Sequence, residues 1–181
     1  VKDSSEAKTG TIMREDTAEN SGVSSHYVID VQGKSSLFFE SGNVKNDSGN
    51  TEGEGASLVR VGDDSVAKYP GLTIRGGTFT QDNFIAIKVE RGTFYLNDGK
   101  VNSANSYAIE NRHRGLIQGG TVNGTVSTWV YSTGAAFSEL EISGGTINGD
   151  VTSVNCGDAD KVAKVEITGG TVTGKLDTRS Y

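Results

Sequence analysis

Two stretches decide the fold: Leu140-Glu-Ile-Ser-Gly-Gly-Thr-Ile147 and Val165-Glu-Ile-Thr-Gly-Gly-Thr-Val172. Both place an apolar residue at every second position before a Gly-Gly pair, which is the alternation of a strand with one buried face. The same frame recurs upstream in segments that begin at Leu37, Leu72, Phe94 and Gly115. Self-similarity of this kind predicts a fold built from repeated units.

The period of the repeat indicates its architecture. The second glycine of each unit falls at Gly42, Gly77, Gly99, Gly120, Gly145 and Gly170, with spacings of 35, 22, 21, 25 and 25 residues. The last three units share a further corner, as in Val122-Asn-Gly124-Thr-Val126, where glycine reaches positive φ without a Cβ penalty. We therefore expect an all-β, right-handed, single-stranded parallel β-helix of about six to seven coils, with neighbouring strands ~4.8 Å apart.

The frame predicts which side chains point inward. The first column contains Leu37, Leu72, Phe94, Gly115, Leu140 and Val165; the second contains Phe39, Ile74, Leu96, Ile117, Ile142 and Ile167; the third contains Val44, Phe79, Val101, Val122, Ile147 and Val172. For the opposite wall we expect Ile29, Ile87, Ile109, Tyr131 and Cys156. No coil buries its column alone, so stacking of coils supplies the core.

The ends of the chain suggest two regions. Residues 1–26 are polar and form an N-terminal cap or a degenerate first coil, in which Gly10-Thr11-Ile12 is a weak copy of the repeat. Residues 27–181 form the β-helix. The terminal strands of a solenoid need a cap. Because Tyr181 falls within a coil, we expect the chain to be a piece of a longer protein.

Composition excludes several classes of function. The chain has 181 residues, 25 of them glycine, and a net charge of −6. This charge argues against a nucleic-acid backbone or an anionic membrane as partner, and no apolar run approaches the roughly 18 residues of a membrane span. The single Cys156 cannot form an intrachain disulfide. We expect the isolated fragment to be a monomer.

The pattern in residues 140–151 and 165–176 resembles the β-helix repeats of large bacterial surface proteins, especially Gram-positive ones. These repeats are similar to the pectate-lyase-like right-handed β-helix group, and the resemblance covers roughly residues 27–181. The group includes adhesins, stalk segments, and polysaccharide lyases and hydrolases. The resemblance implies an extracellular or wall-attached protein that contacts a glycan or protein of a host or the environment.

An enzyme of this group would need paired carboxylates, one to protonate the leaving oxygen and one to activate water. Gly62-Asp63-Asp64 resembles the Gly-Asp-Asp of the pectin hydrolases. However, His113 lacks the preceding glycine of their Gly-His-Gly-like segment, and no Arg-Ile-Lys follows. We therefore expect a polar turn at Asp63 and Asp64, and no catalytic residue.

Aromatic and acidic residues on the turns and outer walls are the candidates for ligand binding. They are Tyr69, Phe137, Asp63, Asp64, Asp158, Asp160, Trp129 and Tyr131. An exposed ring can stack on the face of a pyranose. Trp129 and Tyr131 share one face of a strand, but their counterparts Val154 and Cys156 look buried, which favours a core position for the pair.

We expect no cofactor and no metal ion. His26 and His113 are too far apart in the repeat frame to share a metal site. Cys156 has no histidine placed beside it, so a nucleophilic role is not expected.

Threonines form an outward row on one wall, at Thr78, Thr121, Thr146 and Thr171. Flat Thr-x-Thr arrays are typical of ice-binding β-solenoids. Here Lys100 and Asn102 interrupt the array, and threonine also suits any exposed strand face.

The sequence thus favours a non-catalytic adhesion or ligand-binding module of a bacterial cell-surface protein. A structural spacer or stalk is the first alternative, and a polysaccharide lyase or hydrolase is the second.

Overall fold

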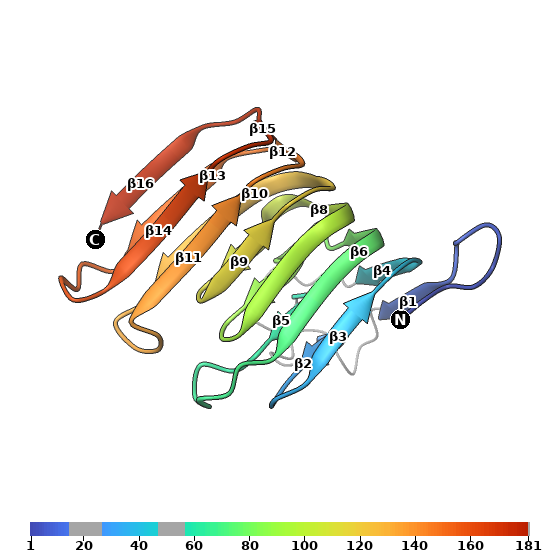
Figure 1. Cartoon of the computed structure of the whole chain (residues 1–181), viewed down its shortest axis with the longest axis horizontal. Helices are drawn as coiled ribbons and strands as arrows, with labels where there is room; N and C mark the ends of the chain where they lie inside the picture. Colours follow the sequence, from blue (N-terminus) through green and yellow to red (C-terminus); the bar gives the residue numbers. More distant parts are fainter. Residues whose placement is uncertain (15–26, 47–56, 181) are drawn as a thin grey trace.

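The computed structural model of the chain describes residues 1–14, 27–46 and 57–180. None of these residues lies in a helix, so none forms a helix able to cross a membrane. Their strands pair in parallel and stack as a β-solenoid of about five turns, with the two termini toward opposite ends of the stack (Figure 1). The all-β parallel β-helix expected from the repeat is confirmed.

Each turn contributes strands to three walls, which we call A, B and C in chain order. Wall A contains β3 (Ser36–Phe39), the start of β6 (Gly71–Thr80), the start of β8 (Thr93–Asn111), β9 (Arg114–Ile117), β11 (Phe137–Ile142) and β14 (Val162–Ile167). Wall B contains β1 (Thr11–Arg14), β4 (Asn43–Asn46), the later parts of β6 and β8, the start of β10 (Thr121–Val130), β12 (Thr146–Asn148) and β15 (Thr171–Val172). Wall C contains β2 (Ile29–Val31), β5 (Val59–Val61), β7 (Ile87–Val89), the ends of β8 and β10, β13 (Val151–Asn155) and β16 (Leu176–Ser180).

The number of turns is slightly lower than the six to seven expected. Wall A recurs from β3 to β14, and about five turns lie between these strands. Within residues 1–14 the one strand is β1, where Ile12 pairs with Val44 of β4, and Val1 hydrogen-bonds to the backbone of Phe38 and Glu40 at the edge of wall A. The rest of the predicted N-terminal region, residues 15–26, lies outside the described residues.

The register confirms the first three inward columns. Leu37, Leu72, Phe94, Gly115, Leu140 and Val165 occupy successive paired positions, as do the members of the second and third columns. Ile74 and Ile142 are fully buried, and each such side chain contributes about 1.5–3 kcal/mol of burial free energy. Ile167 is 40% exposed because no described strand covers β14 on that side.

The column in wall C differs from the prediction. It runs through Ile29, Val59, Ile87, Ile109, Val126, Val151 and Leu176. Tyr131 and Cys156 lie just beyond the ends of β10 and β13, so their predicted place in this column is wrong. The cause is the corner between walls B and C, which shortens from residues 103–106 in one coil to Gly124 in the next. Wall C therefore begins earlier in the later coils.

A polar cluster inside the core explains why Gly115 interrupts its column. Asn111 Nδ2 lies 3.0 Å from Thr128 Oγ1, 3.1 Å from Ser138 Oγ and 2.9 Å from the carbonyl oxygen of Glu139. A Cβ on Gly115 would meet the Asn111 side chain at 3.3 Å. The amide thus fills the space of the missing side chain, and its buried polar atoms are satisfied.

The corners between walls A and B carry the Gly-Gly pairs. The second residue of each corner, a glycine at every position from Gly42 to Gly170, has a φ between 75° and 106°; the residue before it is Ser41 or Asp98 in two corners and glycine in the others. A Cβ on Gly77 would also lie 2.5 Å from the carbonyl oxygen of Gly42 in the preceding coil. Both the backbone conformation and the spacing between coils therefore require glycine.

The outer face of wall B carries the expected rows of threonine and asparagine. Thr121, Thr146 and Thr171 pair in one row. In the next row Asn123 Nδ2 donates to Asn102 Oδ1 at 2.7 Å, and Asn148 Nδ2 donates to Asn123 Oδ1 at 2.8 Å. These contacts satisfy the side chains between coils.

Candidate functional site

Trp129 points away from the core. In β10 the interior positions Val126, Thr128 and Val130 are buried, so the alternation of the strand directs Trp129 to the outer face of wall C. Its pairing with Val154 agrees with the repeat frame. The indole is half-buried and lines a surface hollow. The favoured core position of Trp129 was therefore wrong.

Four side chains form a cluster on this face, which we call the aromatic cluster. The rings of Trp129 and Tyr131 stack with centroids 5.6 Å apart and an interplanar angle of 18°. Tyr107 meets the indole edge to face at 6.3 Å. The Arg112 guanidinium lies 4.4 Å from the centroid of Tyr131, a cation–π distance. Much of the surface of Tyr131 is thus covered, and Trp129 and Tyr107 are the rings that border the hollow.

Two adjacent hollows, of about 560 Å³ and about 240 Å³, lie beside this cluster. They share Tyr107, Thr125 and Asp150, so they form one depression, which we call the groove. The other lining residues are Ser103, Ala104, Asn105, Ser106, Gly124 and Gly149 in the larger hollow, and Trp129, Thr152, Val154 and Arg179 in the smaller.

The groove forms because neighbouring corners differ in length. Residues 103–106 make a long corner in one coil, whereas Gly124 and Gly149 make tight corners in the next two. Gly124 has the expected positive φ, of 133°. At Gly149 the requirement is space instead, because a Cβ would lie 2.3 Å from the carbonyl oxygen of Gly124. The long corner therefore protrudes beside Gly124 and Gly149, where no side chain can be accommodated, and we call these two glycines the floor of the groove.

Few charged groups line the groove. Asp150 follows β12, and its Oδ1 accepts the backbone N–H of Lys175 at 2.8 Å. Arg179 at the far side donates from Nε to Asp177 Oδ2 at 2.7 Å. The remaining lining groups are mostly hydroxyls, amides and aromatic rings. Such a mixture of apolar surface and a few oriented polar groups is typical of ligand sites.

The Gly62-Asp63-Asp64 segment begins the corner between walls C and A. Asp63 Oδ1 accepts the backbone N–H of Ser65 at 2.8 Å, and hydrogen bonds from Ser65 lower the pKa of Asp63. Its other oxygen lies 3.6 Å from Arg60. Asp63 thus has the contacts of a polar turn.

Asp64 lies in a different environment. Burial raises the pKa of Asp64 above its ordinary value, and Arg112 opposes the shift across 3.4 Å. Gly134 packs close to the same carboxylate, since a Cβ there would lie 3.4 Å from Oδ1. Asp64 therefore joins its corner to the corner that follows wall C three coils later.

Tyr69 and Phe137 come together around His113. The ring centroids lie 5.3 Å apart for Tyr69 and His113, and 5.0 Å apart for His113 and Phe137. His113 Nδ1 lies 2.7 Å from the carbonyl oxygen of Gly92. Burial lowers the pKa of His113 below its usual value, so the ring is held neutral. The row runs along the corner between walls C and A, away from the groove.

Asp158 and Asp160 lie on the next corner of the same edge. Asp158 Oδ1 accepts the backbone N–H of Asp160 at 3.1 Å, which makes this a local turn. Lys161 in the same turn donates to the carbonyl oxygens of Tyr131 and Ser132 at 2.8 and 2.7 Å. The structure thus groups the candidates into two sets, with Trp129 and Tyr131 near the groove and the others along the corner.

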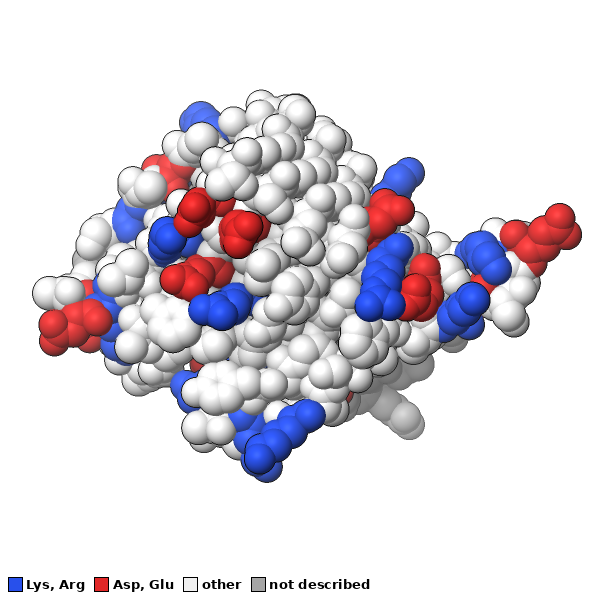
Figure 2. Space-filling view, in the orientation of Figure 1, with Lys and Arg blue, Asp and Glu red and all other residues white. Residues whose placement is uncertain are grey.

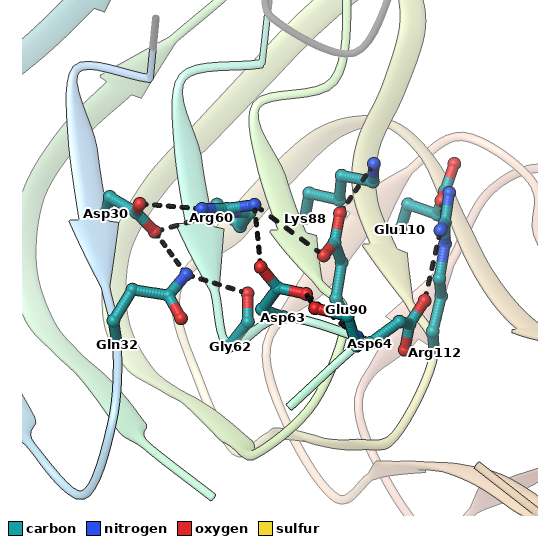
Figure 3. Close-up of polar contacts among 11 residues, drawn as sticks. Asp30, Gln32, Arg60, Gly62, Asp63, Asp64, Lys88, Glu90, Glu110 and Arg112 are labelled. Carbon is teal, nitrogen blue, oxygen red and sulfur yellow. Dashed lines mark hydrogen bonds and ion pairs between the residues drawn. The ribbon is translucent and has the colours of Figure 1, made fainter. Parts of the chain in front are cut away.

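The outer face of wall C is different in the earlier coils, where charged side chains lie side by side on adjacent strands (Figure 3). Arg60 donates to both carboxylate oxygens of Asp30, at 3.1 and 2.8 Å. Lys88 Nζ lies 2.8 Å from Glu90. Farther along the row, Arg112 pairs with Glu110 at 2.6 Å. We call this set the charged ladder; its opposite charges neutralise one another.

The outer face of wall A carries charges of both signs in close proximity (Figure 2). Its ion pairs are Arg75–Glu40 at 3.0 Å, Arg114–Glu139 at 3.1 Å and Lys164–Glu166 at 2.8 Å. A shallow hollow of about 360 Å³ lies among the last two pairs and Tyr95. Because these pairs are exposed and already made, this face is a weaker candidate than the groove.

Of the groove residues, the predicted ligand-binding set contained only Trp129; Tyr107, Thr125, Asp150 and Arg179 are among those that sequence reasoning missed. A signal was present in the unequal corners, since residues 103–106 occupy the place that Gly124 alone takes one coil later. Only stacking shows that such a difference opens a groove.

Among residues 1–14, 27–46 and 57–180, no group of three or more His, Cys, Asp and Glu side chains is arranged to hold a metal ion. Comparison of the chain with protein-family models, curated proteins and solved structures returns no match.

Proposed function

We propose that this chain is a non-catalytic carbohydrate-binding module of an extracellular cell-surface protein, and that the groove is its binding site. The observation that carries the proposal is the placement of Trp129 and Tyr107 at the edge of a depression otherwise lined mostly by hydroxyl, amide and carboxylate groups. The resemblance of the repeat to those of bacterial surface proteins supports the location and the role in adhesion.

The chemistry of the groove suits a sugar. A pyranose has a face of C–H bonds that packs against the negative face of an aromatic ring. Its rim of hydroxyls needs donors and acceptors at fixed positions. Trp129 offers the ring, while Thr125 and Asp150 offer polar atoms in the same depression.

The contacts of Asp63 and Asp64 support binding without catalysis. Ser65 and Arg60 engage Asp63, and Arg112 engages Asp64, whereas neither carboxylate lines the groove. An assay for reducing sugars or unsaturated products on acidic polysaccharides tests this point. If the wild-type chain turned over such a polysaccharide and Asp63→Asn or Asp64→Asn abolished that turnover, the chain would be an enzyme instead.

The direct test is a glycan-binding screen with the whole chain, followed by isothermal titration of the best ligand. We expect Trp129→Ala to weaken binding at least about tenfold, because it removes the ring that packs on the sugar. Phe38→Ala is the matched control, since Phe38 is an exposed ring on wall A, 46% accessible and outside the groove. Thermal unfolding of both variants verifies that each remains folded.

Two results would contradict the proposal. Silence of the wild-type chain across a broad panel of glycans would favour the structural spacer. Binding that survives Trp129→Ala and is lost in Phe38→Ala would move the site from the groove to wall A.

A further inference from the structure

Asp150 occupies the centre of the groove, because it lines both of its hollows. The hydrogen bond from the backbone N–H of Lys175 to Oδ1, at 2.8 Å, holds the carboxylate in one orientation. Among the residues that the structure describes, no Lys or Arg forms an ion pair with it. The carboxylate therefore retains capacity to accept further hydrogen bonds.

Arg179 is the other charged residue of the groove, and its charge is balanced locally. Its guanidinium pairs with Asp177 at 2.6 Å. The uncompensated charge of the groove is thus the single negative charge of Asp150. The remaining polar lining is neutral and includes Asn105, Ser106 and Thr125.

We infer that the groove selects a neutral carbohydrate that presents two neighbouring hydroxyls to Asp150, with its C–H face against Trp129. This inference rests on the proposed carbohydrate-binding function. An ionised carboxylate accepts two O–H donors from adjacent carbons, and such charge-assisted hydrogen bonds are about twice as strong as neutral ones. A uronate or sulfate would bring a second negative charge toward Asp150, which like-charge repulsion disfavours.

The experiment measures binding of the whole wild-type chain to four classes of polysaccharide at one ionic strength. Neutral mannan, galactan, glucan and xylan form the first class; polygalacturonate and alginate form the second; dextran sulfate forms the third; chitosan forms the fourth. We expect binding within the neutral class, with uronates and sulfates bound at least about tenfold more weakly.

Asp150→Asn tests the carboxylate itself. The amide oxygen can still accept the Lys175 N–H, so the local turn is kept while the charge and one acceptor are lost. We expect binding of the neutral ligand to fall about tenfold to a hundredfold. Asp98→Asn is the matched control, since Asp98 also accepts a backbone N–H, that of Gly99, but lies outside the groove; the affinity of this variant should equal that of the wild type.

The outcomes separate this inference from the function on which it rests. Equal or tighter binding of uronates, or an Asp150→Asn variant with unchanged affinity for the neutral ligand, would overturn the inference and leave carbohydrate binding intact. Preference for chitosan would also overturn the inference, because the groove would then recognise an amine rather than two neighbouring hydroxyls. A wild-type chain that binds no polysaccharide would overturn both.

Discussion

The two halves of the outer face of wall C share one backbone and differ in what their side chains do. In the earlier coils the charged ladder pairs Arg60 with Asp30 and Lys88 with Glu90. In the later coils Trp129 and Asp150 border a groove instead. The ladder neutralises its own charges within and between coils, whereas the groove is bordered by the Trp129 ring and the oriented carboxylate of Asp150.

This difference shows how a solenoid separates stability from binding. Arg60 meets Asp30 and Glu90 on the two adjacent coils, at the spacing that the strands impose, and so it stabilises the stack. Lys88–Glu90 and Arg112–Glu110, in contrast, are pairs within one coil. The groove arises where a long corner meets tight corners, so the regular spacing is broken there. Irregular corners on a regular scaffold are where function is expected.

The largest effect is expected at the floor of the groove. Gly124→Ala places a Cβ 2.4 Å from the carbonyl oxygen of Ser103 at a φ of 133°, so neighbouring coils must separate. We expect a loss of about 2–4 kcal/mol in the free energy of unfolding, measured by chemical denaturation.

Gly33→Ala is the control for backbone strain alone. Its φ is 74°, but nothing lies within 4 Å of the added Cβ. We expect this variant to lose only about 1 kcal/mol. Equal losses at Gly33 and Gly124 would show that the close approach of the corners contributes nothing.

Two arginine substitutions distinguish the charged ladder, which should affect stability, from the groove, which should affect ligand binding. Arg60→Met removes the partner of Asp30 and Asp63 in the ladder, and we expect a loss of about 1–2 kcal/mol in unfolding free energy with ligand affinity unchanged. Arg179→Met should change stability by less than about 0.5 kcal/mol, because its ion pair with Asp177 is largely exposed. It should weaken ligand binding, since Arg179 lines the groove. If Arg60→Met weakened ligand binding and Arg179→Met lowered the free energy of unfolding, the assignment of stability to the ladder and of binding to the groove would be contradicted.

The smallest effect is expected from His113, on the corner beside both halves. Burial lowers its pKa below 6.5, assisted by Arg91 and Arg114 and opposed by the Gly92 carbonyl and Asp64. As the pH falls below 6.5, the unfolded chain binds a proton that the folded chain does not, so stability is lost down to the folded pKa. We expect Tm to fall less between pH 7.5 and pH 5 in His113→Gln than in the wild type.

Asp64 should change stability with pH in the direction opposite to that of His113. Burial raises its pKa above 3.8, so the folded state holds the proton more tightly and stability rises as the pH falls through the folded value. Asp64→Asn should remove this gain in stability as the pH falls toward 3.8, as measured by thermal unfolding. A wild-type profile unaffected by either substitution would mean that neither group titrates differently on folding.

Much of the fold follows from local pattern. The alternation around Ile74, Ile142 and Ile167, together with the Gly-Gly corners, predicts the strands, their inward columns and their parallel stacking. The prediction failed for Tyr131 and Cys156 because it counted from the Gly-Gly corner and assumed a constant length for the next corner. The shorter corner at Gly124 moved Val126 into the column instead.

The sequence by itself determined the solenoid, because a period of alternating apolar residues and obligatory glycines allows one stacked arrangement. Only the tertiary structure decided the groove and the outward position of Trp129. Each depends on the register between coils whose corners differ in length, and that register is a property of neighbouring strands rather than of any one segment. The juxtaposition of Tyr107, Trp129 and Asp150, which come from three successive coils, has no local signature in the chain.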